Sequence, residues 1–260
     1  MTGLTWTILY NRSILEDLEK VLVYLKKEGG KANKGEFSGI IKKRGQREDI
    51  LKLVVDIDFV KAESFRNTTR YKLNENGVRY LDIPSENREK YLHAAFYENI
   101  LHYSYFYDAL LEGEIYEFSK SEIIEKIVKK SANDFGVRIF DWKSAENVIK
   151  FMKKFNVITS KSKNKYYVND EYRQIFNEEE FKALIVKKLK EESPQFTKNL
   201  CTYLLDNIER YSTKSKVPMR IIYKRMLNLN EKEKFLRFIP GLPRPPIPSK
   251  HTLVELVGVN

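Results

Sequence analysis

The sequence predicts a mainly α-helical protein with small β-hairpins, an α+β class in which two helical units each end in a hairpin and a further helical region follows. Apolar residues recur at helical spacing over most of the chain, and two pairs of short strand-like stretches flank polar turns, with period-two alternation at Arg70–Leu73. Hydrophobic residues make up 42% of the 260 residues, which is enough for packed cores. We expect four parts, residues 1–87, 88–170, 171–239 and 240–260.

The first unit opens with a capping box, Ser13 with Glu16, and a helix with apolar residues from Ile14 to Leu25 at helical spacing. Gly29 and Gly30 end this helix. The elements expected after it are two helices over 35–43 and 47–55, a hairpin of 59–63 and 70–73 around a turn at 66–69, and a helical cap over 74–81.

The second unit follows one long aromatic helix over 88–112, which is apolar on most of its faces. Such a helix is expected to pack between the units or against another subunit. The elements expected next are a strand over 115–118, a helix from Ser119 or Ser121 to Lys130, a helix capped by Asp141 or Ser144 that runs to Phe155, and strands over 157–160 and 165–168 around a turn at 161–164.

Two segments resemble parts of winged-helix domains. Tyr71–Leu81 resembles the wing exit of MarR- and PadR-type regulators, where a strand ends in a Leu-Thr-x-x-Gly turn and enters a helix; here Asn74 replaces Thr, and both residues are good N-caps. The helix, basic turn and strand of Lys153–Val168 resemble the last helix and wing of many winged-helix families. The resemblance implies two tandem winged-helix domains of no specific family, and we expect no further internal repeat.

The remaining third of the chain is predicted to be helical until a proline-rich tail. Pro240–Pro248 excludes a helix and predicts an extended, polyproline-like tail or arm, and Leu253–Val257 is a candidate strand that adds to a sheet. The helices expected before it cover 176–190, 194–211, 219–226 and 231–238.

Charge is unevenly distributed over a chain whose net charge is +11. Residues 86–125 hold three basic and nine acidic residues (net −6), whereas residues 126–168 hold eleven basic and three acidic residues (net +8). A winged helix typically places its third helix in the major groove and its wing on the adjacent backbone, so lysines on both elements favour binding to DNA phosphates. The alternative is a solvated lysine face. The predicted contacts, with Asn147 as base reader, are Lys126, Lys129, Lys130, Lys143, Asn147, Lys150, Lys153, Lys154, Lys161, Lys163 and Lys165.

Two further basic surfaces are candidates. In the first unit the basic residues are interrupted by Glu48, Asp49, Asp56 and Asp58, so DNA binding and simple packing stay open; its candidates are Arg44, Arg47, Arg66 and Arg70, beside Lys42, Lys43 and Lys52. Residues 210–237 hold nine basic and two acidic residues (net +7). This second patch comprises Arg210, Lys214, Lys216, Arg220, Lys224 and Arg225, with Tyr211 and Tyr223 either stacking on bases or half-buried in a core.

Residues for catalysis or metal binding are sparse. Cys201 is the single cysteine, which excludes an internal disulfide, and the three histidines have no metal-ligand spacing. Asp141-Trp142-Lys143 is similar to the Asp-x-Lys part of restriction-type nucleases, but helix capping explains Asp141 better because no second carboxylate stands at the required distance upstream. We therefore expect no cofactor and no metal site.

These observations favour a non-enzymatic protein that binds double-stranded DNA, either a transcriptional regulator or the recognition subunit of a DNA-processing or defence system. The first alternative is a tandem winged-helix adaptor of an SMC-like or other multi-protein complex, and the minor alternative is a Mg²⁺-dependent nuclease. A homodimer or larger complex would use residues 88–112 and the C-terminal region. No signal layout or membrane span is apparent, so we expect a cytoplasmic protein, nucleoid-associated when bound to DNA.

Overall fold

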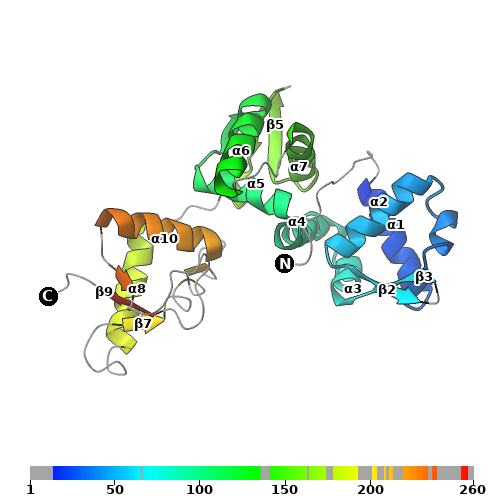
Figure 1. Ribbon diagram of the computed structural model, residues 1–260, viewed down its shortest axis with the longest axis horizontal. Helices are drawn as coiled ribbons and strands as arrows, with labels where there is room; N and C mark the ends of the chain where they lie inside the picture. The colour runs from blue at the N-terminus through cyan, green and yellow to red at the C-terminus, as the bar shows by residue number, and fades with distance from the viewer. Residues whose placement is uncertain are drawn as a thin grey trace. The chain divides into compact units, whose positions relative to one another are not determined.

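The chain folds into helices and small antiparallel sheets, which confirms the α+β class (Figure 1). The computed structural model describes residues 14–65, 67–135, 141–162, 164–173, 178–192, 201–203, 208, 211–212, 219–233, 236–238 and 253–256. The chain divides into two compact units, one formed by 1–109 and 116–169 and the other by 110–115 and 170–260.

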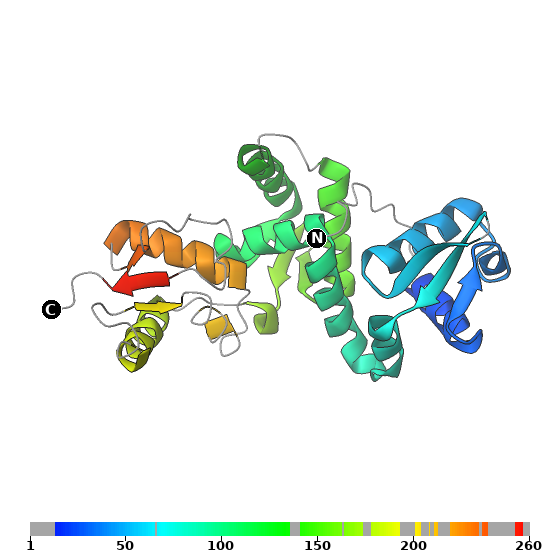
Figure 2. The same ribbon diagram turned by 60° about the horizontal axis from the view of Figure 1, so that its bottom comes forward.

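The first module of the first unit is a helical layer against a three-stranded sheet (Figure 2). The strand order is β1-β3-β2, with Ala32 opposite Tyr71 and Ala62 opposite Tyr71 on its other side. Its elements are α1 (Ile14–Lys27), β1 (Lys31–Asn33), η1 (Glu36–Gly39), α2 (Arg44–Asp56), β2 (Val60–Phe65), β3 (Thr68–Leu73) and α3 (Glu75–Asp82).

Two expectations for this module need correction. The predicted helix over 35–43 is a single 3-10 turn, η1, and the strand β1 before it was not predicted. Three residues are too few to show the period-two alternation that marks a strand. The predicted helix over 47–55 is confirmed and begins earlier, at Arg44.

The second module repeats this order of elements. Its sheet has the order β4-β6-β5, so the strand nearest the N-terminus again pairs with the last strand of the module. Its elements are α5 (Leu101–Glu112), β4 (Glu117–Ser119), α6 (Lys120–Phe135), α7 (Trp142–Lys154), β5 (Ile158–Ser162) and β6 (Lys165–Val168), after the connecting η2 (Ser85–Asn87) and α4 (Arg88–Asn99).

The predicted single helix over 88–112 is wrong, because it is broken at Ile100. Ile100 has extended backbone angles (φ −105°, ψ 104°) and separates α4 from α5. The break lets α4 and α5 fold back, so that the His93 imidazole lies 2.8 Å from the Tyr103 hydroxyl. Burial lowers the pKa of His93 to about 4, so this imidazole is neutral at pH 7. The apolar residues that cover most faces of 88–112 are therefore divided between two short helices, each with its own buried side.

The two modules share the same joint between helix and hairpin. After α2, Phe59 N–H donates to Val54 O (2.9 Å) across the left-handed residue Asp58 (φ 56°). After α7, Val157 N–H donates to Met152 O (2.8 Å) across the left-handed Asn156 (φ 54°). Both are Schellman-type helix ends, in which a residue that tolerates positive φ reverses the chain into a strand.

An asparagine after the last strand closes each joint. Asn74 N–H donates to Phe59 O (3.1 Å), and its side-chain amide donates to Asp58 O (2.7 Å). In the second module, Asn169 N–H donates to Val157 O (2.9 Å), and its side-chain amide donates to Asn156 O. The modules therefore repeat in their hydrogen bonds, although their sequences at the joint differ.

The second unit holds a third sheet with the same strand order. Strand β7 (Cys201–Tyr203) pairs with β9 (Leu253–Leu256), which pairs with β8 (Leu236–Phe238), giving β7-β9-β8. The helices around it are α8 (Glu178–Glu192), after η3 (Asp170–Tyr172), and α10 (Met219–Glu233). We expected no internal repeat beyond the first two modules, but the strand order of their sheets recurs in this third sheet.

Several C-terminal expectations change with this sheet. The strand expected at 253–257 is confirmed as β9 over Leu253–Leu256, so part of the predicted tail forms the central strand of this sheet. The helix expected over 194–211 is wrong at 201–203, which form β7, and the helix expected over 231–238 is wrong at 236–238, which form β8. Helix α10 runs without a break to Glu233. The helix expected over 176–190 is confirmed as α8. Pro240–Pro248 lies outside the described residues.

The Leu-Asn-x-x-Gly turn at the end of β3 has a steric explanation. Asn74 caps α3, as expected, because its Oδ1 accepts from Gly77 N–H (3.0 Å). A Cβ atom on Gly77 would overlap the backbone oxygen of Phe59 and lie 2.7 Å from Leu73 Cδ1. Glycine is required at this position because α3 crosses the start of β2 in direct backbone contact.

We expect Gly77→Ala to lower the free energy of unfolding by about 2 kcal/mol, because the added methyl group forces α3 away from the Phe59 carbonyl. Gly45→Ala is the matched control, since a Cβ there meets no atom within 4 Å and lies in α2. It should raise stability by up to about 1 kcal/mol through helix propensity. Urea unfolding of both variants measures the difference; equal effects would contradict the steric explanation.

Candidate nucleic-acid interface

Helix α7 carries five of the eleven contacts predicted for the second module, more than any other element. Its N-cap is Asp141, which has extended backbone angles and whose Oδ1 accepts from Ser144 N–H (2.6 Å). The face toward the module interior is apolar and buried, and comprises Ala145, Val148, Ile149, Phe151, Met152 and, just after the helix, Phe155. The opposite face is therefore left to solvent.

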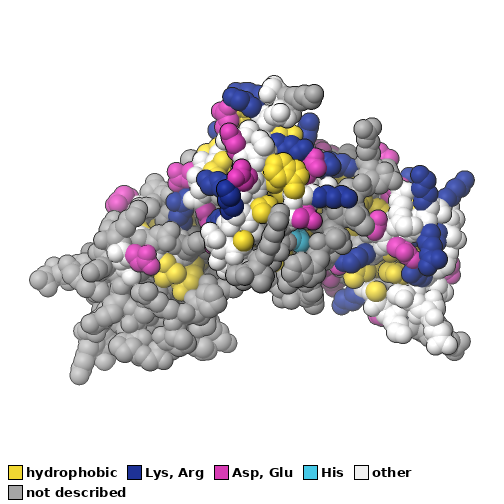
Figure 3. All heavy atoms as spheres, turned by 45° about the horizontal axis from the view of Figure 1, so that its top comes forward, with side chains coloured by type: hydrophobic (Ala, Val, Ile, Leu, Met, Phe, Trp, Pro, Cys, Tyr) yellow, Lys and Arg dark blue, Asp and Glu magenta, His cyan; other side chains and the backbone are white. Residues whose placement is uncertain are grey.

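Lysines dominate this solvent face. At about 3.6 residues per turn, Trp142, Lys143, Glu146, Lys150 and Lys153 fall within an arc of about 100°. Lys143, Lys150 and Lys153 are exposed, and none of them forms an ion pair with a carboxylate among the described residues. We call these three residues the α7 lysine face. In Figure 3, Lys and Arg side chains border exposed hydrophobic atoms over the second module.

The one acidic side chain in this arc is neutralised within the module. Lys120 at the start of α6 donates a hydrogen bond to Glu146 Oε1. This bond holds the pKa of Glu146 below its usual range, and the charge of Lys150 acts in the same direction. The arc thus carries three uncompensated positive charges.

The hairpin beside α7 adds two lysines. Lys161 Nζ lies 3.9 Å from the centre of the Tyr167 ring, a cation–π contact that orients the ammonium group on β5. Lys165 on β6 lies 3.9 Å from Glu117, and both side chains are largely exposed, so this pair is weak. Lys163 lies outside the described residues.

The lysines of α6 are less available than predicted. Lys129 pairs with Glu125 (2.7 Å) and Lys130 pairs with Asp134, each one helical turn apart. Lys126 is exposed. Surface pairs of this type are weak, but they reduce the net positive charge that α6 offers to an anion.

Two predicted contacts on α7 are less exposed than the prediction requires. Asn147, the expected base reader, is only 6% exposed and lies at the edge of the buried face. Lys154 is partly buried, and this burial lowers the pKa of its ammonium group. Asn147 lies beyond the arc of the α7 lysine face and next to the buried face, whereas Lys154 lies close to the edge of the arc, so helical geometry applied to the sequence separates Asn147 more clearly than Lys154.

Sequence reasoning missed Trp142 as a surface feature. Its side chain is 48% exposed, although tryptophan is usually buried for most of its area. It is the first residue of α7 and shares the arc with the lysines. The signal was its position three turns before Lys153, on the same side of the helix.

In the first module the helix that corresponds to α7 is α2, and its basic side chains are paired with carboxylates. On α2, Glu48 pairs with Arg44 (3.3 Å) and with Lys34 (3.4 Å), and the hydrogen bonds from Arg44 and Lys34 lower the pKa of its carboxyl group. Lys52 pairs with Asp56 (2.8 Å). The basic residues of α2 are therefore largely compensated.

Two of the other predicted contacts in this module, Arg47 and Arg70, are only partly exposed. Arg47 is partly buried, and its guanidinium donates to Ile41 O (3.0 Å), which is a structural role. Arg70 on β3 is partly exposed, opposite Glu63 in the sheet register. Arg66 lies outside the described residues.

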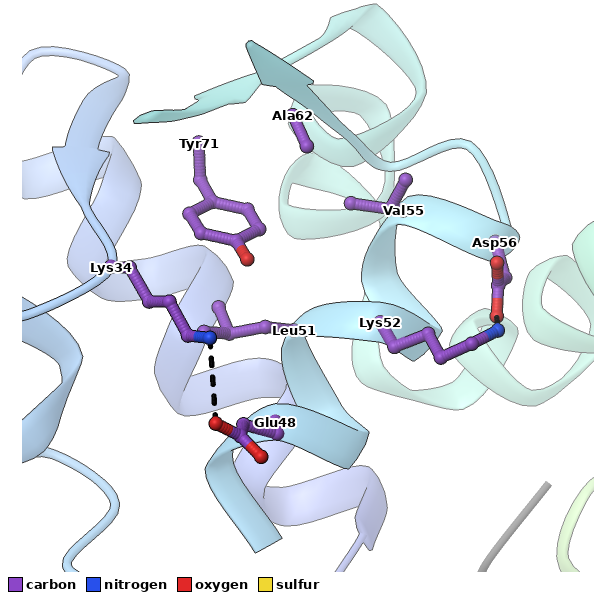
Figure 4. A pocket seen from close by; sticks show the side chains of 8 residues that line it. All are labelled: Lys34, Glu48, Leu51, Lys52, Val55, Asp56, Ala62 and Tyr71. Atoms are coloured by element: carbon purple, nitrogen blue, oxygen red, sulfur yellow. Dashed lines mark hydrogen bonds and ion pairs between the residues drawn. The ribbon is translucent and has the colours of Figure 1, made fainter. Parts of the chain in front are cut away.

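A shallow pocket of about 240 Å³ lies between α2 and the sheet of the first module (Figure 4). Its walls include the apolar side chains of Leu51, Val55 and Ala62, with the ring of Tyr71 directed into it. The pairs Lys34–Glu48 and Lys52–Asp56 stand at its rim. A pocket with apolar walls and a neutral rim suits an apolar side chain better than a phosphate.

In the second basic patch the structure describes one side chain fully. Arg225 on α10 donates from Nη2 to Leu111 O (3.2 Å) and Glu112 O (2.7 Å) and pairs with Glu114 (3.3 Å). It satisfies the carbonyl groups at the end of α5, so its prediction as a DNA contact is corrected. Tyr211 and Tyr223 are buried, which favours their core role. Arg210, Lys214 and Lys216, and the side chains of Arg220 and Lys224, lie outside the described residues.

Other classes of site have little support in the described part of the chain. No group of three or more His, Cys, Asp or Glu side chains in it is arranged to hold a metal ion. Asp141 of the Asp-x-Lys sequence serves as an N-cap at the start of a helix. None of the described helices combines the length and hydropathy needed to cross a membrane.

Comparison with known proteins gives only distant likeness. No protein-family model and no curated protein matches the chain. Among solved structures, a chain titled "Structure of restriction endonuclease FokI" is similar at 11% identity with a TM-score of 0.34, over 83% of this chain and 48% of that one. The chain thus spans about half the length of that chain. A likeness at this TM-score supports neither a fold nor a function.

Proposed function

We propose that the chain is a non-enzymatic protein that binds double-stranded DNA through α7 and the β5-β6 hairpin of a winged-helix module. The observation that carries this proposal is the α7 lysine face, three exposed lysines without acidic partners among the described residues. Lys161 and Lys165 extend the positive charge onto the hairpin. Lysine ammonium groups on a helix and on an adjacent hairpin suit the phosphates that flank a major groove.

The winged-helix assignment rests on the order of elements in both modules. Each has a helix, a short strand, a second helical segment, a third helix and a hairpin, and in each the short strand pairs with the last strand. The shared Schellman joint and closing asparagine support a common architecture. The strand order β7-β9-β8 extends the proposal to a third module in the second unit.

Within this proposal the first module has a secondary role. Its third helix, α2, carries the ion pairs Arg44–Glu48 and Lys52–Asp56, so approach to phosphates would require these pairs to break. The protein would then act as a transcriptional regulator or as the recognition subunit of a DNA-processing or defence system, with the second module as its principal contact.

A second candidate is a tandem winged-helix adaptor of a multi-protein complex, SMC-like or other. The observation that favours it is the pocket of the first module, where Leu51, Val55 and Tyr71 offer apolar contacts inside a neutral rim. In that function the hairpins and third helices bind protein, and the α7 lysine face is a solvated surface.

Salt dependence separates the two functions. A labelled duplex of mixed sequence, about 30 base pairs long, should bind with an affinity that falls roughly 40-fold between about 50 and 200 mM salt if three lysines contact phosphates. Fluorescence anisotropy measures this directly. An adaptor would show no duplex binding at the lower salt concentration and would co-elute with a protein partner at high salt, which would overturn the DNA proposal.

A further inference from the structure

Trp142 is the most exposed large hydrophobic side chain in the described part of the chain. The other two with comparable exposure are Val23 (41%) and Val78 (37%), against 48% for Trp142. No aromatic ring of a described residue stacks on its indole. About half of a large apolar side chain is therefore exposed to water on an otherwise polar helix face, and aromatic side chains are enriched where protein surfaces bind partners.

The position of Trp142 relates it to the α7 lysine face. It is the first residue of α7, directly after the N-cap Asp141, and lies in the same arc as the three lysines. The inference that follows rests on the proposed function, binding of double-stranded DNA through α7. When a helix enters the major groove, its N-terminal residues approach the base edges while flanking basic residues contact phosphates. The indole is then the large side chain nearest to the bases.

The chemistry of the indole limits what it can recognise there. Its one polar group is the Nε1–H donor, and the rest of its surface is apolar. The apolar group that the major groove presents is the C5-methyl group of thymine. A 5-methylcytosine carries the same methyl group at the same ring position. We propose that Trp142 contacts the C5-methyl group of a pyrimidine in the major groove and thereby sets the base preference of the second module.

The test uses duplexes selected from a random-sequence pool with the wild-type protein. In one arm each thymine of a selected duplex is replaced in turn by uracil, which removes only the methyl group. In the other arm cytosines are replaced by 5-methylcytosine, which adds it. Burial of one methyl group predicts a loss of about fourfold in affinity at one thymine position, or a gain of about fourfold at one cytosine position. The first result identifies thymine as the source of the methyl group, and the second identifies 5-methylcytosine.

Two variants link the effect to the indole. Trp142→Ala should bind the methylated and unmethylated duplexes equally, and Val78→Ala, which removes another exposed apolar side chain, should keep the discrimination. Trp6→Phe leaves Trp142 as the only tryptophan of the chain. In this background the selected duplex should quench the indole fluorescence and protect it from acrylamide.

The outcomes distinguish the two proposals. If the wild type binds no duplex, both the proposed function and the role of Trp142 are overturned. If the wild type binds duplexes but no methyl replacement changes the affinity, or if Trp142→Ala keeps the discrimination, the role of Trp142 is overturned and the function of the α7 lysine face stands.

Discussion

Reversing the charge of Lys143, Lys150 and Lys153 together to Glu should abolish duplex binding, with a loss of affinity of at least about 100-fold at moderate salt. The three ammonium groups stand on one face of α7 with no acidic partner among the described residues, so each is available to a phosphate. Replacement by Glu removes this attraction and adds repulsion. A mobility-shift assay with a mixed-sequence duplex measures the effect.

The matched control reverses three lysines of the first module that lie away from its third helix. Lys27, Lys31 and Lys72 are exposed, and their reversal changes the net charge by the same amount. If binding depends on the α7 lysine face, this control should lose much less affinity than the α7 variant. Equal losses would show that only overall charge matters. Circular dichroism should show the same helix content and melting temperature for both variants, since all six side chains are exposed.

The second large effect concerns Phe96, which joins α4 to the inner face of α7. Its side chain is fully buried, with ring centres 4.7 Å from Phe151 and 4.8 Å from Phe155. Tyr103 on α5 closes the cluster at 5.6 Å. We expect Phe96→Ala to lower the free energy of unfolding by about 4 kcal/mol, because it removes a ring from a packed aromatic cluster and leaves a cavity.

Urea unfolding tests this expectation with two companion variants. Phe96→Leu keeps part of the volume and should cost about half as much. Val23→Ala removes methyl groups from a side chain that is 41% exposed and should change stability by less than about 0.5 kcal/mol. A Phe96→Ala variant as stable as Val23→Ala would contradict the packing of α4 against α7.

Local chemistry made part of the fold predictable from the sequence. The caps Asn74 and Asp141 were predicted because short polar side chains before an apolar helical pattern satisfy free N–H groups. The hairpin β5-β6 was predicted from two short stretches rich in β-branched and aromatic residues around a polar turn. These signals act within a few residues, so they are visible in the sequence.

The features that were not predicted depend on contacts distant in the sequence. Strand β1 has three residues and exists because it pairs with β3, about forty residues later. Strand β7 pairs with β9, about fifty residues later, and its three residues are too few to show an alternating pattern. The break at Ile100 follows from the packing of α4 on α5 around His93 and Tyr103, which no local pattern reports.

For the candidate site, the elements were predicted better than the individual residues. Lys143, Lys150 and Lys153 are exposed on α7, as contact with DNA requires, and their role as contacts stays a prediction. Asn147 was predicted to read bases because its amide group suits that role, but its side chain is buried at the edge of the inner face of α7. The pairs Arg44–Glu48 and Lys52–Asp56 lie one helical turn apart within α2, but the Lys34–Glu48 pair links residues distant in the sequence and could not be predicted from local spacing.

The dependence of duplex affinity on salt, compared between the wild type and a variant with Lys143, Lys150 and Lys153 changed to Ala, tests the central claim most directly. Alanine removes the charges without adding repulsion, so the change in slope reports how many phosphate contacts these lysines make. The plot of log affinity against log salt should be shallower in the variant by about 2.7, which is the contribution of three phosphates. Identical slopes would contradict the assignment of DNA binding to the α7 lysine face.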